Sequence, residues 1–387
     1  MQTRDNNVKN GFLAYPEVAQ QLAAGLTPEV LEAAIPSEVL KGIKRVVITG
    51  NGDSYAASMA TQEFNSKMFG QIDYYALRCV DVSRHFVFPQ ENRKETLVVV
   101  ISVSGGGSRV TEAMKRAAAK GCTTLAITGN PESRMAKEAE YILKIQVPKG
   151  EGFSPANQTR SYFSTLFAVL SLGLHAGKAK GVISAQEQKD LQAQMCKYVS
   201  DTYCEEVLGR VDDQIEKLAD SWKDYLGYDF VGGGVDFAGA YFGAAKFFEL
   251  CGSLNCLNDC EDWCHIDYFQ TKRDQLGTVM VATKNCASFS RSVETVGSMQ
   301  KSQRNVLVVT DAEADAFIPG VTVCTIPSAP CAAFTPLTNF IPLCMLANYI
   351  ALKRGYPYFG GMDDSNPLFS QTGNINTIKS SEIVMVD

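Results

Sequence analysis

The chain has 387 residues, of which 45% are hydrophobic, and it carries a formal net charge of −6. This length and apolar content predict a globular protein of about two domains. Acidic and basic residues are interspersed, which disfavours a nucleic-acid partner. Residues 1–20 lack an export signal and we find no apolar run of about 18 residues that indicates a membrane span, so we expect a cytoplasmic protein without a membrane partner.

The first half of the chain repeats a pattern of strand, glycine turn and helix. Residues 45–54 predict a buried strand that runs into the turn GNGDS before a helix, and residues 96–108 predict a second strand that ends in SVSGGGS before another helix. Two more strands are expected at 123–133 and 141–147, with a short helix between them. This alternation is typical of an α/β domain, so the first domain should hold at least four parallel strands.

The second half repeats the same pattern after a charged, helix-prone stretch. A strand, glycine turn and helix are expected at 228–250, and further strands at 277–283 and 305–315. We therefore predict five segments: an N-terminal extension at 1–40, a first α/β domain at 41–180, a helical connector at 181–225, a second α/β domain at 226–355 and a tail at 356–387.

The glycine turns are the expected place for chemistry, because ligands of open parallel sheets bind beyond the carboxyl ends of the strands. The turn SVSGGGS offers the hydroxyls of Ser102, Ser104 and Ser108, and its glycines let backbone N–H groups approach an anion at a helix amino terminus. It lacks the GK[ST] ending of a nucleotide-binding P-loop. A small phosphorylated molecule is the expected ligand; the alternative is that these residues only shape turns and cap helices.

The twelve cysteines are expected to be reduced and mostly buried. Cys256, Cys260 and Cys264 are spaced four residues apart, so a helix would place them on one face, near Cys251 and His265. Three ligands on consecutive turns of one helix do not easily close a tetrahedral zinc site. We therefore expect packed thiols, no metal site and no cofactor, with zinc as the alternative.

The motifs GNGDS, ISVSGGGS, AITGNPESRMAKEAEYILKI and SPANQTRSYFSTLFAVLSL, in this order, resemble the sugar isomerase (SIS) domain family. The repeated plan resembles the tandem SIS module of glucosamine-6-phosphate synthase and of fructosamine-6-phosphate deglycases. The resemblance implies two SIS domains from about residue 40 onward, each a flavodoxin-like, doubly wound αβα sandwich with a parallel sheet.

By the same resemblance, the chain should bind a sugar 6-phosphate as a small-molecule partner. The implied phosphate contacts are Ser54, Ser102, Ser104 and Thr159, and Arg160 stands where the synthase pattern has a lysine. Because Gly107 occupies the usual threonine position, Ser108 is expected to substitute for it. Supporting contacts to the substrate are expected from Gly52, Asp53 and Gly105.

Three residues match the catalytic positions of the synthase-like proteins. Glu249 corresponds to the glutamate that moves protons between C1 and C2 of the sugar, and its apolar neighbours suit a base of raised proton affinity. His265 corresponds to the histidine that assists ring opening, and the resemblance implies that it reaches across a subunit interface. Lys379 corresponds to a tail lysine that forms an imine with the open-chain ketose; a surface lysine is the alternative.

The resemblance implies an enzyme that works as a homodimer or a higher homo-oligomer. Because Met1 is followed by Gln2 instead of the cysteine nucleophile of a glutaminase domain, we expect no glutamine-driven synthesis. We favour a deglycase or deaminase acting on a 6-phosphorylated fructosamine or amino sugar. The alternatives are an aldose–ketose isomerase of amino-sugar phosphates and a regulator that binds phosphosugars without catalysis.

Overall fold

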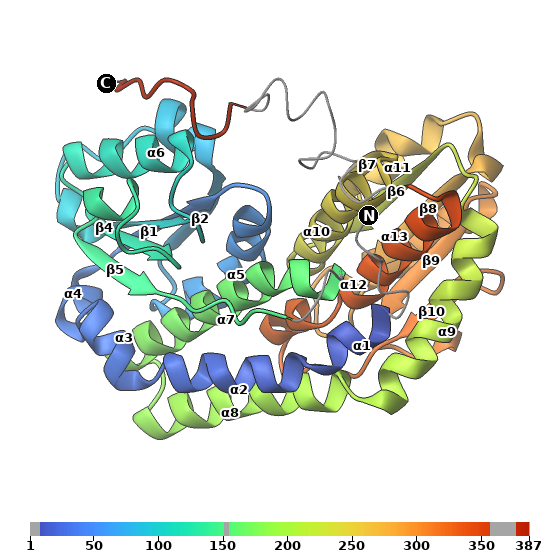
Figure 1. The fold of residues 1–387 in the computed structure, drawn as a ribbon, viewed down its shortest axis with the longest axis horizontal. Helices are drawn as coiled ribbons and strands as arrows, with labels where there is room; N and C mark the ends of the chain where they lie inside the picture. The colour runs from blue at the N-terminus through green and yellow to red at the C-terminus, as the bar shows by residue number, and fades with distance from the viewer. Residues whose placement is uncertain (1–7, 151–154, 357–376, 387) are drawn as a thin grey trace. The chain divides into compact units, whose positions relative to one another are not determined.

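The computed structural model describes residues 8–150, 155–356 and 377–386, and the chain divides into two compact units (Figure 1). The first unit contains Glu17–Lys149, Arg160–Cys196 and the described part of the tail, residues 377–386. The second unit contains the other described residues, most of them in 197–356. The tail is thus part of the first unit, although it follows the second unit in sequence.

The first unit is built on a five-stranded parallel sheet of order β2-β1-β3-β4-β5. Its central strands consist of β-branched and aliphatic residues and are buried throughout, as expected for a sheet covered on both faces. The strands are β1 (Arg45–Gly50), β2 (Asp73–Arg78), β3 (Thr96–Ile101), β4 (Thr123–Thr128) and β5 (Tyr141–Lys144).

Helices cover both faces of this sheet. The helix α5 (Asp53–Met68) packs with α7 (Pro155–Ala179), where Asn65 donates a hydrogen bond to the Val169 carbonyl, and α6 (Ser108–Ala119) lies over the opposite face (Figure 1). This arrangement follows from right-handed crossovers in opposite directions along the sheet. The other helical elements are α2 (Tyr15–Gly25), α3 (Pro28–Ala34), α4 (Ser37–Gly42), η1 (Asp81–His85), η2 (Arg93–Glu95), η3 (Ala136–Glu138) and α8 (Ala185–Thr202).

The second unit repeats the topology with a five-stranded parallel sheet of order β10-β9-β8-β6-β7. The strands β6 to β10 correspond, in chain order, to β1 to β5 of the first sheet. The strands are β6 (Gly227–Gly232), β7 (Leu254–Asp259), β8 (Leu276–Val281), β9 (Asn305–Thr310) and β10 (Thr322–Thr325). The predicted fold class, two doubly wound α/β units, is confirmed.

The helices of the second unit include α10 (Val235–Cys251), which connects β6 to β7 and packs on α13 (Ile341–Arg354). The residues predicted as a helical connector, 181–225, contain α8 and α9 (Glu205–Trp222); α8 up to Cys196 belongs to the first unit, and the rest belongs to the second. The other helical elements are α1 (Val8–Leu13), α11 (Asp262–His265), η4 (Asp267–Phe269), η5 (Arg273–Gln275), α12 (Phe289–Lys301), η6 (Ala314–Ala316) and η7 (Ala332–Leu337).

Residues 332–354 are long and apolar enough to cross a membrane by composition alone, a possibility that the sequence analysis did not identify. Of the most apolar 18-residue window in this segment, 94% is buried inside the protein. Its helix α13 therefore packs as a core helix.

Three strands were not predicted: β2, β7 and β10. Each lies at an edge of its sheet; β2 begins and ends with a charged residue and β7 contains three polar residues, so neither reads as a continuous buried run. The prediction of one helical face for Cys256, Cys260 and Cys264 is wrong, because Cys256 lies in β7 and only Cys264 lies in a helix, α11. The strand requires a side-chain period of two residues rather than 3.6.

Candidate functional site

The first glycine turn joins β1 to α5 and positions Ser54. Gly52 precedes the helix with φ of 52°, a left-handed conformation that favours glycine. A Cβ on Gly50 would lie 2.4 Å from Ser54 Cβ and 3.1 Å from the Ile101 carbonyl oxygen, so this turn brings Ser54 against the carboxyl end of β3. Ser54 is 9% exposed, and Asp53 beside it is half-buried in the first turn of α5.

The second glycine turn follows β3 and carries Ser102 and Ser104. The Gly105 amide donates to Ser102 Oγ at 3.1 Å, and the Gly106 amide donates to Ser104 Oγ at 3.4 Å. Gly105 has φ of 61°, and a Cβ there would lie 2.0 Å from Ser133 Oγ, so only glycine fits. Ser104 is exposed and Ser102 is half-buried, and both therefore present hydroxyls at the carboxyl edge of the first sheet.

Ser108, the first residue of α6, lies in a different environment from the one expected. It is fully buried, and its Oγ accepts a hydrogen bond from Arg134 Nη2 at 3.3 Å. Its amide donates to the tail carbonyl of Ile378 at 2.8 Å. The tail thus occupies one donor at the amino terminus of α6, a contact that no local sequence pattern indicates. Ser108 is therefore less available to a ligand than Ser102 and Ser104.

Lys379 belongs to the described part of the tail and lies beside this second turn. A Cβ on Gly106 would lie 3.9 Å from Lys379 Cε and 4.0 Å from Ser104 Oγ. The Lys379 carbonyl accepts a hydrogen bond from Arg134 Nη2 at 3.3 Å, while its side chain is exposed. The structure therefore brings Lys379 together with the serine-glycine turn, defined here as residues 102–108.

Thr159 and Arg160 are both buried near the start of α7. Thr159 Oγ1 lies 2.5 Å from the Tyr15 hydroxyl, and both residues belong to the second unit. Arg160 belongs to the first unit and donates from Nη1 to the Pro148 carbonyl at 3.3 Å. Because Thr159 and Ser102 lie in different units, the structure does not assemble the whole predicted phosphate set within one unit.

The second unit has a counterpart of the first glycine turn that holds a carboxylate instead of a hydroxyl. Gly234 precedes α10 with φ of 53°, as Gly52 does before α5, and Asp236 occupies the position of Ser54. Asp236 is 1% exposed and accepts hydrogen bonds from the Thr283 amide at 2.8 Å and the Thr283 hydroxyl. Burial raises the pKa of Asp236 to about 7, although the hydrogen bonds from Thr283 oppose this shift. This turn is filled by an acid and is unsuited to phosphate.

Glu249 lies in the last turn of α10 and pairs with a lysine that the sequence analysis did not single out. Lys246 Nζ lies 2.7 Å from Glu249 Oε2, and the Lys246 side chain is 4% exposed against 38% for Glu249. The expected neighbour Phe248 is instead 53% exposed. A cation this close stabilises the ionised carboxylate, which is the form that accepts a proton.

His265 ends α11 and has an exposed side chain. Its Nε2 lies 3.0 Å from Glu261 Oε1, and Glu261 also accepts a hydrogen bond from Arg291 Nε at 2.6 Å. The side chain of His265 is 65% exposed. The neighbouring carboxylate of Glu261 can therefore orient the ring.

Glu249 and His265 lie at opposite ends of the strands of the second sheet. Glu249 is near the carboxyl end of α10, just before β7 begins, whereas His265 follows the carboxyl end of β7. The strand β7 has six residues and rises about 3.3 Å per residue, so its two ends lie roughly 20 Å apart. One chain therefore does not bring this predicted pair together.

The cysteines of residues 251–264 are spread over several elements. Cys251 and Cys260 are buried, Cys264 is half-buried and Cys256 is exposed on β7. Among the described residues, no group of three or more histidine, cysteine, aspartate or glutamate side chains is arranged to hold a metal ion. Burial raises the pKa of Cys251 and of Cys260, so both thiols favour the protonated form.

Comparison with known proteins relates this arrangement to phosphosugar proteins. Residues 39–174 match the family model of the SIS domain. A glutamine–fructose-6-phosphate aminotransferase (isomerizing) of Bradyrhizobium diazoefficiens is 26% identical over 331 residues, which cover 81% of this chain and 50% of the relative. The chain thus spans about half the length of the curated relatives that it matches over most of its own length.

Solved structures share the fold of nearly the whole chain. The C-terminal domain of glucosamine-fructose-6-phosphate aminotransferase from Francisella tularensis superposes with a TM-score of 0.74 at 15% identity, covering 92% of this chain and 98% of that domain. Glucosamine-6-phosphate deaminase from Thermotoga maritima superposes with a TM-score of 0.58 at 16% identity, covering 88% and 94%. The SIS resemblance is thus confirmed for residues 39–174, and the chain shares the overall fold of these solved structures.

Proposed function

We propose that this protein is a phosphosugar enzyme that transfers a proton between C1 and C2 of a 6-phosphorylated 2-amino sugar and releases the amine, as a deaminase. The observation that carries the proposal is Lys379 beside Gly106 in the serine-glycine turn. The match of residues 39–174 to the SIS domain, and the similarity to glutamine–fructose-6-phosphate aminotransferases, support the substrate class.

The first unit offers the better place for the phosphate. Ser54, Ser102 and Ser104 present hydroxyls at the carboxyl edge of its sheet, near the amino termini of α5 and α6. The corresponding position in the second unit is the buried acid Asp236. The Asp236 carboxyl group fills this position and offers acceptors instead of donors to an anion, so we assign the phosphate to the first unit only.

The lysine favours an amine on C2 over an amine on C1. A lysine that adds to a C2 imine of the sugar displaces ammonia and forms its own imine at C2, and water then hydrolyses that imine to the ketose and the free lysine. A fructosamine carries its amine on C1, and its aldose product must keep the oxygen on C2. Imine formation at C2 therefore serves deamination of a 2-amino sugar but not deglycation of a fructosamine.

The proposed reaction consumes one water and releases one ammonia. His265 protonates the ring oxygen and the sugar opens to an aldehyde. Glu249 removes the proton from C2, and a proton is delivered to C1, so that the aldehyde becomes an alcohol and the C2–N bond becomes an imine. Lys379 adds to C2 and ammonia leaves. Water then releases the ketose 6-phosphate and frees the lysine.

A homodimer would supply the two acid–base groups that one chain holds far apart. Large exposed apolar side chains flank both groups in sequence: Phe248 and Leu254 near Glu249, and Ile266 and Phe269 after His265, between 53% and 76% exposed. Large exposed apolar side chains favour contact with another protein surface. We infer that a second copy of the chain covers them, and that His265 of one copy serves the site of the other.

Two other functions would use some of the same residues, and the product screen described below distinguishes them. Aldose–ketose isomerisation of an amino-sugar phosphate uses the same proton transfer, and the word "isomerizing" in the name of the curated relatives favours it. A regulator that only binds phosphosugars needs the serine-glycine turn but not Glu249 or His265. Amine release is preferred because it requires only water as the second reactant, whereas amination requires a supply of ammonia.

The test is a mass-spectrometric product screen with Glu249→Gln as the control. Glucosamine 6-phosphate should yield a ketose 6-phosphate and ammonia, and the Glu249→Gln protein should yield neither. A hexose 6-phosphate formed from 6-phosphorylated fructosamines alone would establish a deglycase instead. If no substrate reacts but calorimetry detects sugar-phosphate binding, the protein is a regulator and the proposal is wrong.

A further inference from the structure

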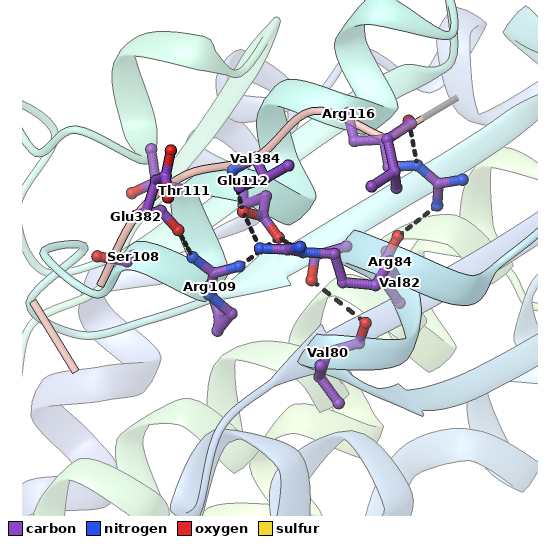
Figure 2. A network of polar contacts seen from close by, with 12 residues as sticks. Val80, Val82, Arg84, Ser108, Arg109, Thr111, Glu112, Arg116, Glu382 and Val384 are labelled. Atoms are coloured by element: carbon purple, nitrogen blue, oxygen red, sulfur yellow. Dashed lines mark hydrogen bonds and ion pairs between the residues drawn. The ribbon is translucent and has the colours of Figure 1, made fainter. Parts of the chain in front are cut away.

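After a turn at residues 378–380, the described tail lies along α6 and is held there by polar contacts (Figure 2). Arg109 on α6 donates a hydrogen bond to the Glu382 carbonyl, and Arg116 Nε donates to the Val386 carbonyl at 3.2 Å. The Val384 amide donates in the opposite direction, to Glu112 Oε2 at 2.7 Å. The tail is thus bound mainly through its backbone.

Glu112 is at the centre of these contacts, although the sequence analysis did not identify it. It is fully buried, and Arg84 and Arg109 both form ion pairs with its carboxylate. Arg109, Glu112 and Arg116 are spaced three and four residues apart, which places them on one face of α6. A buried carboxylate that loses partners is costly, so the Val384 amide is a required donor and not an incidental contact.

The ionisation of Glu112 is favourable in this setting. Burial alone would raise the pKa of Glu112, but the hydrogen bonds from Arg84 and Val384 and the charge of Arg109 hold it below its ordinary value. Cys79 is a further titratable group in this neighbourhood, and burial raises its pKa to about 12. Glu112 is therefore charged at neutral pH and accepts from the tail as a carboxylate.

A second set of contacts joins the tail to the serine-glycine turn. Arg134 Nη2 donates to the Lys379 carbonyl at 3.3 Å and to the Gly106 carbonyl at 3.0 Å. The Ser108 amide donates to the Ile378 carbonyl at 2.8 Å. These contacts position residues 378 and 379, whereas the contacts of Arg109, Glu112 and Arg116 anchor the tail three to eight residues further on, at 382–386.

We propose that Glu112, with Arg109 and Arg116, is a positioning device for Lys379: it docks the tail on α6 and so keeps the lysine amine beside the serine-glycine turn. Glu112 acts through the tail and does not itself touch the substrate. The inference rests on the proposed function of Lys379, and its test has one readout that does not depend on catalysis.

Val384→Pro is the sharpest variant, because it removes the amide that donates to Glu112 and leaves the buried carboxylate and both arginines unchanged. Val384→Ala is the matched control, since it keeps the amide and removes only an exposed side chain. Glu112→Gln is the complementary variant from the α6 side. It keeps the shape of the side chain and removes its charge.

Hydrogen–deuterium exchange of residues 378–386 reports docking without any substrate. The loss of one hydrogen bond to a charged group should speed exchange of these amides in Val384→Pro about tenfold to a hundredfold, whereas Val384→Ala should match the wild type. Exchange in Val384→Pro at the wild-type rate would overturn the docking role of Glu112.

Borohydride trapping with fructose 6-phosphate reports the position of the lysine. The Lys379 amine condenses with the C2 carbonyl, water leaves, and borohydride reduces the imine to a stable amine that mass spectrometry locates on Lys379. We expect Val384→Pro and Glu112→Gln to lower the initial trapping rate and kcat about tenfold or more, with KM for the phosphosugar changed less than threefold.

The outcomes separate the two claims. A wild type that traps at Lys379 and a Val384→Pro variant that traps equally fast, despite faster exchange, would refute the positioning role and leave the proposed function intact. A wild type that traps nothing at Lys379 and deaminates no amino-sugar phosphate would refute the proposed function, and the positioning role with it.

Discussion

Asp236 predicts an unusual dependence of stability on pH in the second unit. Its pKa is raised from the ordinary 3.8 to about 7 because the carboxyl group is buried. The folded state therefore binds the proton more tightly than the unfolded state. As a result, Asp236 stabilises the folded state most at a pH below the pKa that it has in the unfolded chain. Its contribution to the free energy of unfolding is lost as the pH rises from about 4 to about 7.

The magnitude follows from the size of the shift. One pKa unit corresponds to about 1.4 kcal/mol, so ionisation of Asp236 should cost about 4 kcal/mol above pH 7, of which about 3 kcal/mol accrues between pH 5 and pH 8. Asp236→Asn keeps the size of the side chain and can still accept one hydrogen bond from Thr283, but it does not ionise. The variant should gain about 3 kcal/mol relative to the wild type on going from pH 5 to pH 8.

Urea unfolding, monitored by tryptophan fluorescence, measures this difference in stability between variant and wild type, and it reports on the second unit alone. The chain has two tryptophans, Trp222 and Trp263, and both lie in the second unit. Asp315→Asn, at an exposed position of the same unit, is the control and should show no such pH-dependent gain. A stability difference between Asp236→Asn and the wild type that stays constant from pH 5 to pH 8 would show that the buried acid is not held in its protonated form.

Three further predictions concern the proposed reaction. Ser102→Ala or Ser104→Ala should raise KM for a 6-phosphate substrate by the loss of about 1.5–3 kcal/mol, while an unphosphorylated analogue is hardly affected; an equal loss on both would indicate misfolding. Activity should survive exhaustive chelation, because the proposed proton transfers use side chains only; one zinc per chain whose removal abolishes activity would refute this. Glu249→Gln should lower kcat about 10²–10⁴-fold. Mixing the Glu249→Gln and His265→Asn proteins under conditions of subunit exchange should restore some activity if the two groups of one site come from different copies. If no activity is restored, the shared site is refuted, but the roles of the two residues are not.

Local sequence patterns were sufficient to predict the central strands of both sheets and the helices that follow the glycine turns. The central strands β1, β3, β4, β6, β8 and β9 are short, almost wholly buried segments rich in hydrophobic residues, and glycine turns follow β1, β3, β4 and β6, so these signals lie within about ten residues of one another. The helices after the glycine turns, and the candidates Ser54, Ser102 and Ser104, followed from the same patterns. The edge strands β2 and β7 were missed because polar residues interrupt their apolar runs, so that neither shows the pattern of a buried strand.

Only the tertiary structure decided which of the candidate residues lie together. Glu249 and His265 are sixteen residues apart in sequence, yet the intervening strand β7 places them at opposite ends of the strands of a sheet. Ser108 is buried and Lys379 lies beside Gly106 because the tail docks on α6, through contacts between residues that are about 270 positions apart. Hydrogen bonds between such distant residues leave no periodic signal in the sequence, since they depend on how whole elements pack and not on the residues next to them.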